Sequence, residues 1–281
     1  MTKPGTPKRG TLALVTRPGE PGQRLSTALR DRGQRALWWP AFDLLAPAEL
    51  EPLQALLQRL AEFELAVFVS PAAVRGLSAL DLCGPWPAAT RIAAVGASTL
   101  QLAHRLLPGA AAARGIGPGT DPEKAGSEAL WDTLRRDGPL PRRALIVRAE
   151  SGRDWLGDRL REAGCQVEYA GVYRRVVHLP SPEQRAALGA SRGAGDRAVP
   201  VVTSSEAVAA LDRQLAEAPD ARAWLRQGLA LCSHGRIAQA LRAAGYVEVH
   251  ECEPSAADVL EAICGAARGE AVARMAQARA Q

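Results

Sequence analysis

The stretch LIVRAESGRDWLGDRLREAGCQVEYAGVYRR (Leu145–Arg175) repeats the pattern of LALVTRPGEPGQRLSTALRDRGQRALWWPAF (Leu12–Phe42). Each begins with an apolar run, continues through an arginine and turn residues, and then carries apolar residues at helical spacing. A shift of 131 residues aligns Arg17 with Arg148, Leu25 with Leu156, Leu29 with Leu160, Gly33 with Gly164, Trp38 with Tyr169 and Phe42 with Tyr173. One strand–helix unit is therefore present twice.

The repetition continues along the chain. VFVSPAAV (67–74) matches PVVTSSEAV (200–208), and AAVGASTLQLA (93–103) matches ALCSHGRIAQA (230–240). Three matches in the same order indicate a duplication that relates residues 11–134 to residues 144–263. A period this long predicts two similar domains rather than a solenoid.

Apolar runs of strand length recur, and a stripe of helical spacing follows nearly every one. The runs are Leu12–Thr16, Leu65–Ser70, Ile92–Gly96, Ala144–Arg148, Val199–Ser204 and Leu229–Ser233. Strands that alternate with helices predict an α/β fold with parallel sheets. Because the runs are continuously apolar, we expect helices on both faces of each sheet.

Two segments occupy equivalent places in the repeat and are candidate hinges. They are residues 37–42 and 168–176, and Pro40 disfavours a central strand in the first. We interpret them as the two inter-domain crossings of a strand-swapped pair. The expected first domain is residues 1–38 plus 176–266, the second is residues 42–170, and residues 267–281 form a tail.

Composition limits the class of protein. The chain has 281 residues, of which 47% are hydrophobic, and it contains no run of 18 apolar residues or signal-peptide pattern. Its five cysteines form no CxxC pair, which favours a reducing cytoplasm. The formal net charge of +5 fits an anionic ligand, but it fits a compositional bias toward arginine equally well. No basic run with interleaved aromatics supports nucleic-acid binding.

The expected strand ends carry small polar residues before each helix. Ligands of open α/β sheets bind at this edge, where helix N-termini offer unpaired N–H groups to carboxylates or phosphates. The alternative is that each Ser or Thr only caps its helix. Six such loops, arranged twice over, favour a ligand with many anionic groups bound between two lobes.

Several catalytic arrangements are missing from the sequence. It has no Walker A lysine loop, no GxGxxG after the first strand and no GxSxG elbow. The four histidines lack metal-ligand spacing, so we expect no metal. His104 lies on a helical stripe and is structural, whereas His234 follows a strand and is a candidate ligand contact.

The ordered set of motifs resembles the uroporphyrinogen-III synthase family. The motifs are LVTRP, FVSPAAV, AAVGASTL, GSEAL, LIVRAESGRDWL, VYRR, VVTSSEAV and SHGRIAQALRAAGY, and together they run from about residue 12 to 263. The resemblance implies two flavodoxin-like α/β domains, joined by a two-stranded linker, with the active site in the cleft between them.

The resemblance also implies the chemistry. The substrate is hydroxymethylbilane, a linear tetrapyrrole with eight carboxylates, which loses water and closes to uroporphyrinogen III with inversion of ring D. The enzyme is then a cyclising carbon–oxygen lyase of haem and tetrapyrrole biosynthesis that needs no cofactor. A pyrrole expels hydroxide readily, so the protein mainly folds the chain and excludes the wrong closure.

The resemblance implies a catalytic residue and a set of substrate contacts. Tyr173, in VYRR, is the expected proton donor, although a purely structural linker tyrosine is the alternative. The expected substrate-binding residues are Thr16, Arg17, Ser70, Ala72, Thr99, Ser127, Arg148, Ser151, Gly152, Ser204, Ser205, Ser233, His234 and Arg236. Arg236 departs from the small hydroxyl residue of many relatives, so it either pairs with a carboxylate or marks a contact that differs.

The alternative from another class is a non-catalytic, two-lobed cytosolic binding protein for an anionic small molecule. For the leading interpretation we expect a cytoplasmic monomer with a small-molecule substrate and neither a nucleic-acid nor a membrane partner. The Ala/Arg-rich tail is more consistent with a frayed terminus than with a partner-binding segment.

Overall fold

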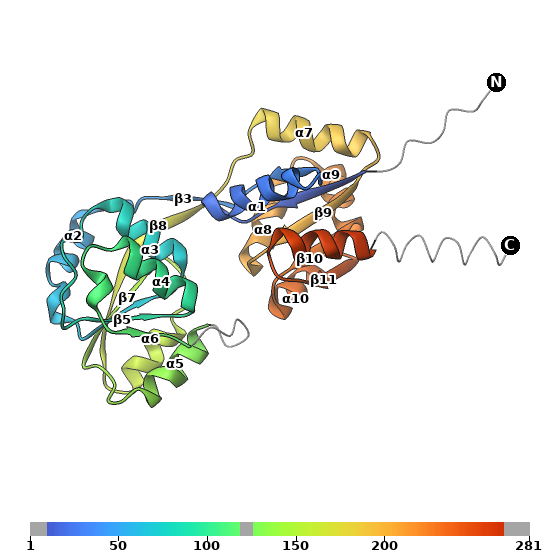
Figure 1. The fold of residues 1–281 in the computed structure, drawn as a ribbon. Helices are drawn as coiled ribbons and strands as arrows, with labels where there is room; N and C mark the ends of the chain where they lie inside the picture. Colours follow the sequence, from blue (N-terminus) through green and yellow to red (C-terminus); the bar gives the residue numbers. More distant parts are fainter. Residues whose placement is uncertain (1–9, 119–125, 267–281) are drawn as a thin grey trace, which may run out of the picture. The chain divides into compact units, whose positions relative to one another are not determined.

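The computed structural model describes residues 10–118 and 126–266. The chain divides into two compact units, of which unit 1 combines Met1–Asp43 with Val176–Gln281 and unit 2 is Leu44–Arg175 (Figure 1). The domains expected from the sequence, residues 1–38 plus 176–266 and residues 42–170, leave only residues 39–41 and 171–175 outside both, and these bounds stay a prediction. The expected tail, residues 267–281, lies outside the described residues.

Unit 1 is built on a five-stranded sheet of order β11-β10-β9-β1-β2. Its strands are β1 (Thr11–Val15), β2 (Ala36–Trp38), β9 (Arg197–Val202), β10 (Leu229–Cys232) and β11 (Glu248–Glu251), and every neighbouring pair is parallel. Its helices are α1 (Gly19–Asp31), α7 (Pro182–Gly193), α8 (Ser205–Gln214), α9 (Pro219–Gln227), α10 (Gly235–Ala243) and a helix at residues 256–266.

Unit 2 is built on a six-stranded sheet of order β3-β8-β7-β4-β5-β6. Its strands are β3 (Phe42–Leu45), β4 (Leu65–Phe68), β5 (Arg91–Ala94), β6 (Gly115–Ile116), β7 (Arg143–Ala149) and β8 (Gln166–Val177). Its helices are α2 (Glu51–Gln58), α3 (Pro71–Leu80), α4 (Ala97–Leu106), α5 (Ser127–Arg136) and α6 (Trp155–Glu162), with short 3₁₀ turns η1 (Leu60–Glu62) and η2 (Ala110–Ala112).

The sheet orders confirm the α/β fold class and show how the repeat is used. The order β2-β1-β9-β10-β11 in unit 1 corresponds to β8-β7-β4-β5-β6 in unit 2. Of these five corresponding strands, each sheet takes two from one half of the chain and three from the other half, and the unit 2 sheet has β3 of the first half as an additional edge strand. This 2-1-3-4-5 order is the flavodoxin-like order.

Both faces of each sheet are buried, as the continuous apolar runs predicted. In β1, Leu12 and Leu14 pack into one core cluster, and Ala13 and Val15 pack into the cluster on the opposite face. In unit 2, Ala66 and Phe68 belong to one cluster and Leu65 and Val67 to the other. Alternate side chains of one strand therefore stabilise two separate layers.

The chain passes between the units in β3 and β8, which are neighbours in the unit 2 sheet. Pro40 interrupts the first passage, so β2 ends at Trp38 and β3 begins at Phe42. Gln214 of α8 holds both passages to unit 1. Its Oε1 accepts from Trp39 Nε1 at 2.8 Å, and its Nε2 donates to the carbonyls of Pro40 at 2.8 Å and His178 at 3.0 Å.

Asp196 joins several elements at the amino end of the unit 1 sheet. Its carboxylate, 5% exposed, accepts from Gly10 N at 3.1 Å, from the Ser191 hydroxyl and from the Arg35 guanidinium. Asp196→Ala leaves the buried Ser191 hydroxyl without its acceptor, so it should lower the free energy of unfolding by about 2–4 kcal/mol. Urea denaturation followed by circular dichroism measures the change.

The matched control is Asp220→Ala. The Asp220 carboxylate is 82% exposed and lies 3.3 Å from Arg192. Its loss should change the free energy of unfolding by less than about 1 kcal/mol. Equal shifts for the two variants would show that the Asp196 network does not stabilise the sheet.

Candidate active site

The loops of unit 1 that were expected to bind substrate lie at one edge of its sheet. Strands β10, β9 and β1 are adjacent and parallel, so their carboxyl ends point the same way. This edge carries Thr16 and Arg17 after β1, Ser204 and Ser205 after β9, and Ser233, His234 and Arg236 after β10.

Two of these side chains cap helices. Ser204 Oγ accepts from Ala207 N at 3.3 Å at the start of α8, and His234 Nδ1 accepts from Arg236 N at 3.1 Å at the start of α10. Because His234 Nδ1 accepts, its Nε2 carries the proton in the neutral ring and is a donor. His234 and Arg236 are exposed, so both remain accessible to a ligand.

The side chain of Thr16 is enclosed within unit 1. It is fully buried, and its hydroxyl donates to the Val201 carbonyl at 2.9 Å. In unit 2, Thr99 is likewise 2% exposed within the first turn of α4. Both residues are therefore buried within their units, at the end of β1 and in the first turn of α4.

The corresponding edge of the unit 2 sheet carries the remaining expected residues. Ser70 caps α3, its Oγ accepting from Ala73 N at 3.1 Å, and Ala72 lies in the first turn of that helix. Ser127 is the first residue of α5. Ser151 and Gly152 are exposed in the loop between β7 and α6.

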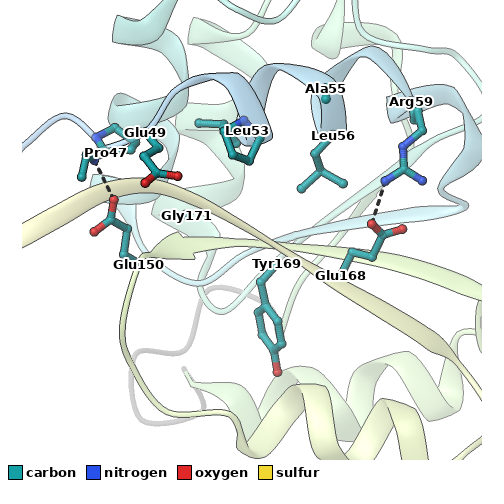
Figure 2. Close-up of a pocket in the computed structure, with 12 residues that line it drawn as sticks. Pro47, Glu49, Leu53, Ala55, Leu56, Arg59, Glu150, Glu168, Tyr169 and Gly171 are labelled. Atoms are coloured by element: carbon teal, nitrogen blue, oxygen red, sulfur yellow. Dashed lines mark hydrogen bonds and ion pairs between the residues drawn. The ribbon is translucent and has the colours of Figure 1, made fainter.

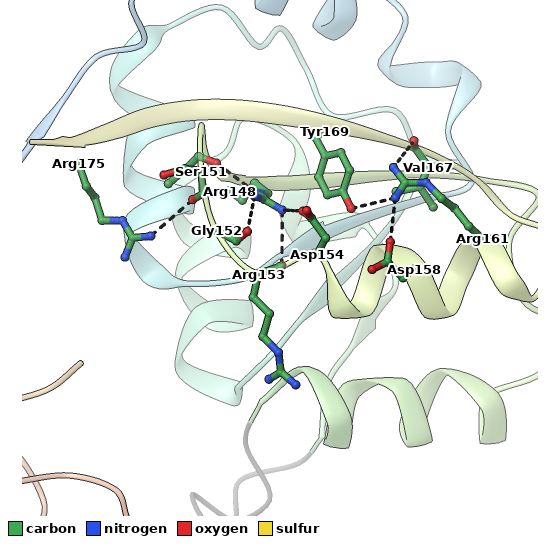
Figure 3. Close-up of polar contacts among 11 residues, drawn as sticks. Arg148, Ser151, Gly152, Arg153, Asp154, Asp158, Arg161, Val167, Tyr169 and Arg175 are labelled. Atoms are coloured by element: carbon green, nitrogen blue, oxygen red, sulfur yellow. Dashed lines mark hydrogen bonds and ion pairs between the residues drawn. The ribbon is translucent and has the colours of Figure 1, made fainter. Parts of the chain in front are cut away.

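Arg148 lies beneath this last loop and is almost enclosed by it. Its side chain is 10% exposed, and its Nη2 donates to the Gly152 carbonyl at 3.0 Å while its Nε donates to the Ala149 carbonyl at 3.2 Å. Nη1 pairs with the Asp154 carboxylate, and Figure 3 shows these contacts converging on one guanidinium. These hydrogen-bond partners of Arg148 are thus groups of its own loop.

The ring of Tyr169 in β8 stacks against the Arg148 guanidinium. The Arg148 guanidinium carbon lies 4.7 Å from the centre of the ring, and that of Arg161 lies 5.1 Å from it. Arg161 also donates to the Tyr169 hydroxyl at 3.3 Å. A Cβ on Gly157 would lie 2.0 Å from that hydroxyl, so glycine is required where α6 passes the ring.

Unit 1 holds the equivalent loop with Trp38, the residue that the repeat aligns with Tyr169. Trp38 Nε1 donates to the Arg17 carbonyl at 3.0 Å. A Cβ on Gly22 would lie 1.8 Å from that carbonyl oxygen and 2.8 Å from Nε1. In both units an aromatic residue of the second strand therefore fixes the loop that follows the first strand.

The enclosed arginine orients the peptide groups of its loop. The carbonyls of Gly152 and Arg153 face Arg148, at 3.0 and 3.5 Å. In a trans peptide the N–H points opposite to the C=O, so the N–H groups of Arg153 and Asp154 face away from Arg148. The loop thereby presents donors at the start of α6, where the helix dipole also favours an anion.

Tyr173 lies in β8 beside this loop. Its carbonyl accepts from Glu150 N at 2.8 Å, and its half-buried ring packs against the core cluster that α3 covers. Within residues 10–118 and 126–266, its hydroxyl makes no hydrogen bond. A phenol held by its ring with an unused hydroxyl fits a proton donor.

A groove of about 480 Å³ lies between α2 and β8, and Glu150, the first residue of the loop after β7, lines it (Figure 2). Arg59 and Glu168 pair across it at 2.8 Å, and Glu150 Oε1 accepts from Ala48 N at 2.9 Å. None of the residues expected to bind substrate lines the groove. We therefore assign the candidate site to the two loop edges.

Four of the five cysteines are poor candidates for a nucleophile. Burial raises the pKa of the Cys165 and Cys252 thiols to about 11, and it also raises the pKa of Cys83 and Cys232. A protonated thiol attacks weakly. Among the described residues no three His, Cys, Asp or Glu side chains gather to hold a metal ion, and no helix there is long and apolar enough to span a membrane.

Sequence reasoning missed Trp38, Tyr169 and Asp154 as residues that shape the loops. The repeat had aligned Trp38 with Tyr169 and Arg17 with Arg148. In a parallel strand pair the second strand runs beside the loop that follows the first strand. The alignment could therefore have predicted that Trp38 and Tyr169 contact the loops after Arg17 and Arg148. Asp154 carried no such signal, because an exposed acid before a helix resembles any N-cap.

Comparison with known proteins gives a consistent match. Residues 23–279 match the model of the family described as Uroporphyrinogen-III synthase HemD. Uroporphyrinogen-III synthase of Salmonella typhimurium is 29% identical over 251 residues, which cover 88% of this chain and 97% of that protein. The Escherichia coli protein of the same name is 28% identical over 174 residues, 61% of this chain and 68% of that protein.

Solved structures support the fold. A mutant uroporphyrinogen III synthase from the extremely thermophilic bacterium Thermus thermophilus aligns with a TM-score of 0.56 and 21% identity, covering 92% of this chain and 99% of the other. Uroporphyrinogen-III synthetase from Helicobacter pylori aligns with a TM-score of 0.53 and 15% identity over the same shares.

Arg148→Lys tests whether the arginine organises its loop. Lysine lacks the planar fork that serves several acceptors at once, so the loop should loosen by about 1–3 kcal/mol. Exchange of the Glu150 amide, measured by NMR, should then accelerate by roughly five- to a hundredfold. The control is Arg105→Lys, an exposed residue of α4. Unchanged exchange together with a raised KM would instead make Arg148 a direct substrate contact.

Proposed function

Because the chain belongs to the uroporphyrinogen-III synthase family, we propose that it converts hydroxymethylbilane into uroporphyrinogen III with inversion of ring D. The chain is thus an enzyme of tetrapyrrole synthesis. One observation carries the proposal: the family match, residues 23–279, includes both units rather than one α/β unit.

The loop edges fit a polycarboxylate substrate. Hydroxymethylbilane carries eight carboxylates, and each sheet ends in several helix N-termini with N–H donors. The exposed His234 and Arg236 add a ring N–H and a guanidinium in unit 1. In unit 2 the outward N–H groups of Arg153 and Asp154 serve the same purpose.

We propose a cofactor-independent hydro-lyase reaction. The carbon–oxygen bond of the terminal hydroxymethyl group breaks, the pyrrole nitrogen supplies the electrons that form an azafulvene, and a donated proton releases the oxygen as water. The far ring attacks the azafulvene and is inverted through a spiro intermediate, and loss of a proton restores the aromatic ring. Binding the substrate in a folded conformation is the larger part of the catalysis.

Tyr173 is the proposed proton donor to the departing hydroxyl. A phenol hydroxyl can donate a proton or a hydrogen bond to a departing oxygen. Two observations support this role: the Tyr173 ring packs against the core, and its hydroxyl makes no hydrogen bond to the described residues. None of the other expected site residues is a phenol.

We also propose a monomer in the cytoplasm. All five cysteines are free, which is the usual state of thiols in that compartment. Size-exclusion chromatography with light scattering measures the oligomeric state.

A product assay separates the enzyme from a binding protein without catalysis. Purified protein is supplied with hydroxymethylbilane, and the type I and type III isomers are separated by chromatography. The enzyme yields mainly type III. A product mixture identical to that of the protein-free reaction, despite measurable substrate binding, would support the binding protein.

Tyr173→Phe should keep the fold and lower turnover by about tenfold to a thousandfold, since it removes one positioned donor. The product should still be mainly the type III isomer, because the folded substrate pose is retained. Steady-state kinetics and isomer separation on the purified variant measure both effects.

Phe42→Tyr is the matched control, since the repeat aligns Phe42 with Tyr173. Adding a hydroxyl there should change turnover by less than about twofold. A wild-type rate for Tyr173→Phe would show that the hydroxyl is not the acid and that the residue is structural.

A further inference from the structure

The side chains of β8 alternate between the two faces of the unit 2 sheet up to residue 170. Ala170 is buried in the cluster under α3, and Tyr169 packs on the opposite face with α6. Strict alternation would place Val172 under α3 and Tyr173 on the α6 face. Both Val172 and Tyr173 instead pack against the cluster under α3.

A β-bulge causes this change of face. Arg148 pairs with Gly171, but the next residue of β7, Ala149, pairs with Tyr173, so Val172 is the extra residue. One added residue moves every later side chain to the other face of the strand. The bulge therefore aims Tyr173 at α3 rather than at α6.

Gly76 of α3 lies against the bulge. A Cβ on Gly76 would lie 2.9 Å from the Val172 carbonyl oxygen, 3.2 Å from Val172 Cγ2 and 3.4 Å from Tyr173 Cδ1. Glycine destabilises a helix interior relative to alanine, so its presence here calls for a reason. The close approach of α3 to the bulged main chain supplies that reason.

Gly171 completes the arrangement on the other side of the bulge. A Cβ there would lie 3.2 Å from both Cα and Cγ of Glu150, whose N–H donates to the Tyr173 carbonyl at 2.8 Å. The bulge is thus enclosed between α3 and the loop after β7. The N-cap of the same helix, Ser70, belongs to the expected substrate-binding loop after β4.

We propose that Gly76 is a positioning residue that sets the place of the Tyr173 hydroxyl by allowing α3 to contact the bulge in β8. This proposal rests on the proposed role of Tyr173 as proton donor. A methyl group at residue 76 would push the bulge and the tyrosine ring by roughly a few tenths of an ångström, and catalytic steps are sensitive to such shifts.

Gly76→Ala should lower kcat by about tenfold, change KM by less than about twofold and leave the circular dichroism spectrum unchanged. The decisive readout is the same substitution in a Tyr173→Phe background. If Gly76 acts through the hydroxyl, Gly76→Ala has no further effect on kcat there. The control is Gly189→Ala on α7, where nothing lies within 4 Å of the added Cβ, and it should leave kcat unchanged.

The outcomes separate this proposal from the proposed function. If Tyr173→Phe is slow but Gly76→Ala turns over at the wild-type rate, or slows both backgrounds equally, the positioning role is overturned while the donor role stands. If Tyr173→Phe itself has the wild-type rate, the donor role fails and the positioning role fails with it.

If Gly76→Ala does not fold, Gly171→Ala tests the same proposal. Gly171→Ala disturbs the same bulge from the side of Glu150 and retains α3 unchanged. It should lower kcat by about tenfold in the wild-type background and have no effect in the Tyr173→Phe background. Losses of equal size in both backgrounds would overturn the proposal.

Discussion

The constraint on which this structure depends is the exchange of strands between the two halves of the chain. The unit 1 sheet is complete only when two strands of the first half join three of the second, and the unit 2 sheet only when two strands of the second half join four of the first. The chain must therefore pass between the units twice, and the two passages, β3 and β8, become neighbours. The loops at the carboxyl edge of each sheet consequently come from both halves of the chain. Residues of the two halves can therefore change separately at one edge.

The two duplicated halves hold the loop after their first strand with different side chains. The loop after the first strand must be held against the second strand in both units. Unit 1 uses one indole N–H on a carbonyl, whereas unit 2 buries an arginine against a phenol ring and surrounds it with carbonyls. The Arg148 guanidinium donates to more acceptors than the indole N–H of Trp38 does. It does so in the unit whose loop lies beside Tyr173.

The sequence predicted the features that repeat and missed those that depend on distant partners. Apolar runs located β1, β4, β5, β7, β9 and β10, because buried parallel strands are continuously apolar. Residues 168–176 were expected to cross between the domains, but the twelve residues of β8 were not predicted as one strand because Glu168 and Arg175 interrupt its apolar character. The burial of Arg148 could not be predicted either, because nothing in the residues around it distinguishes a buried arginine from an exposed one. Tyr169, whose ring packs against its guanidinium, lies 21 residues further along the chain.

The discontinuous unit has a consequence for biosynthesis. Unit 2 is one continuous stretch, so its strands are all available once residue 177 has left the ribosome. Strand β1 is made first but pairs with β9, which ends at Val202, so its apolar edge stays open while more than half of the chain is translated. An open apolar edge in a nascent chain is a target for chaperones and a risk for aggregation. The order of translation thus makes the first strand of this protein one of the last to be secured.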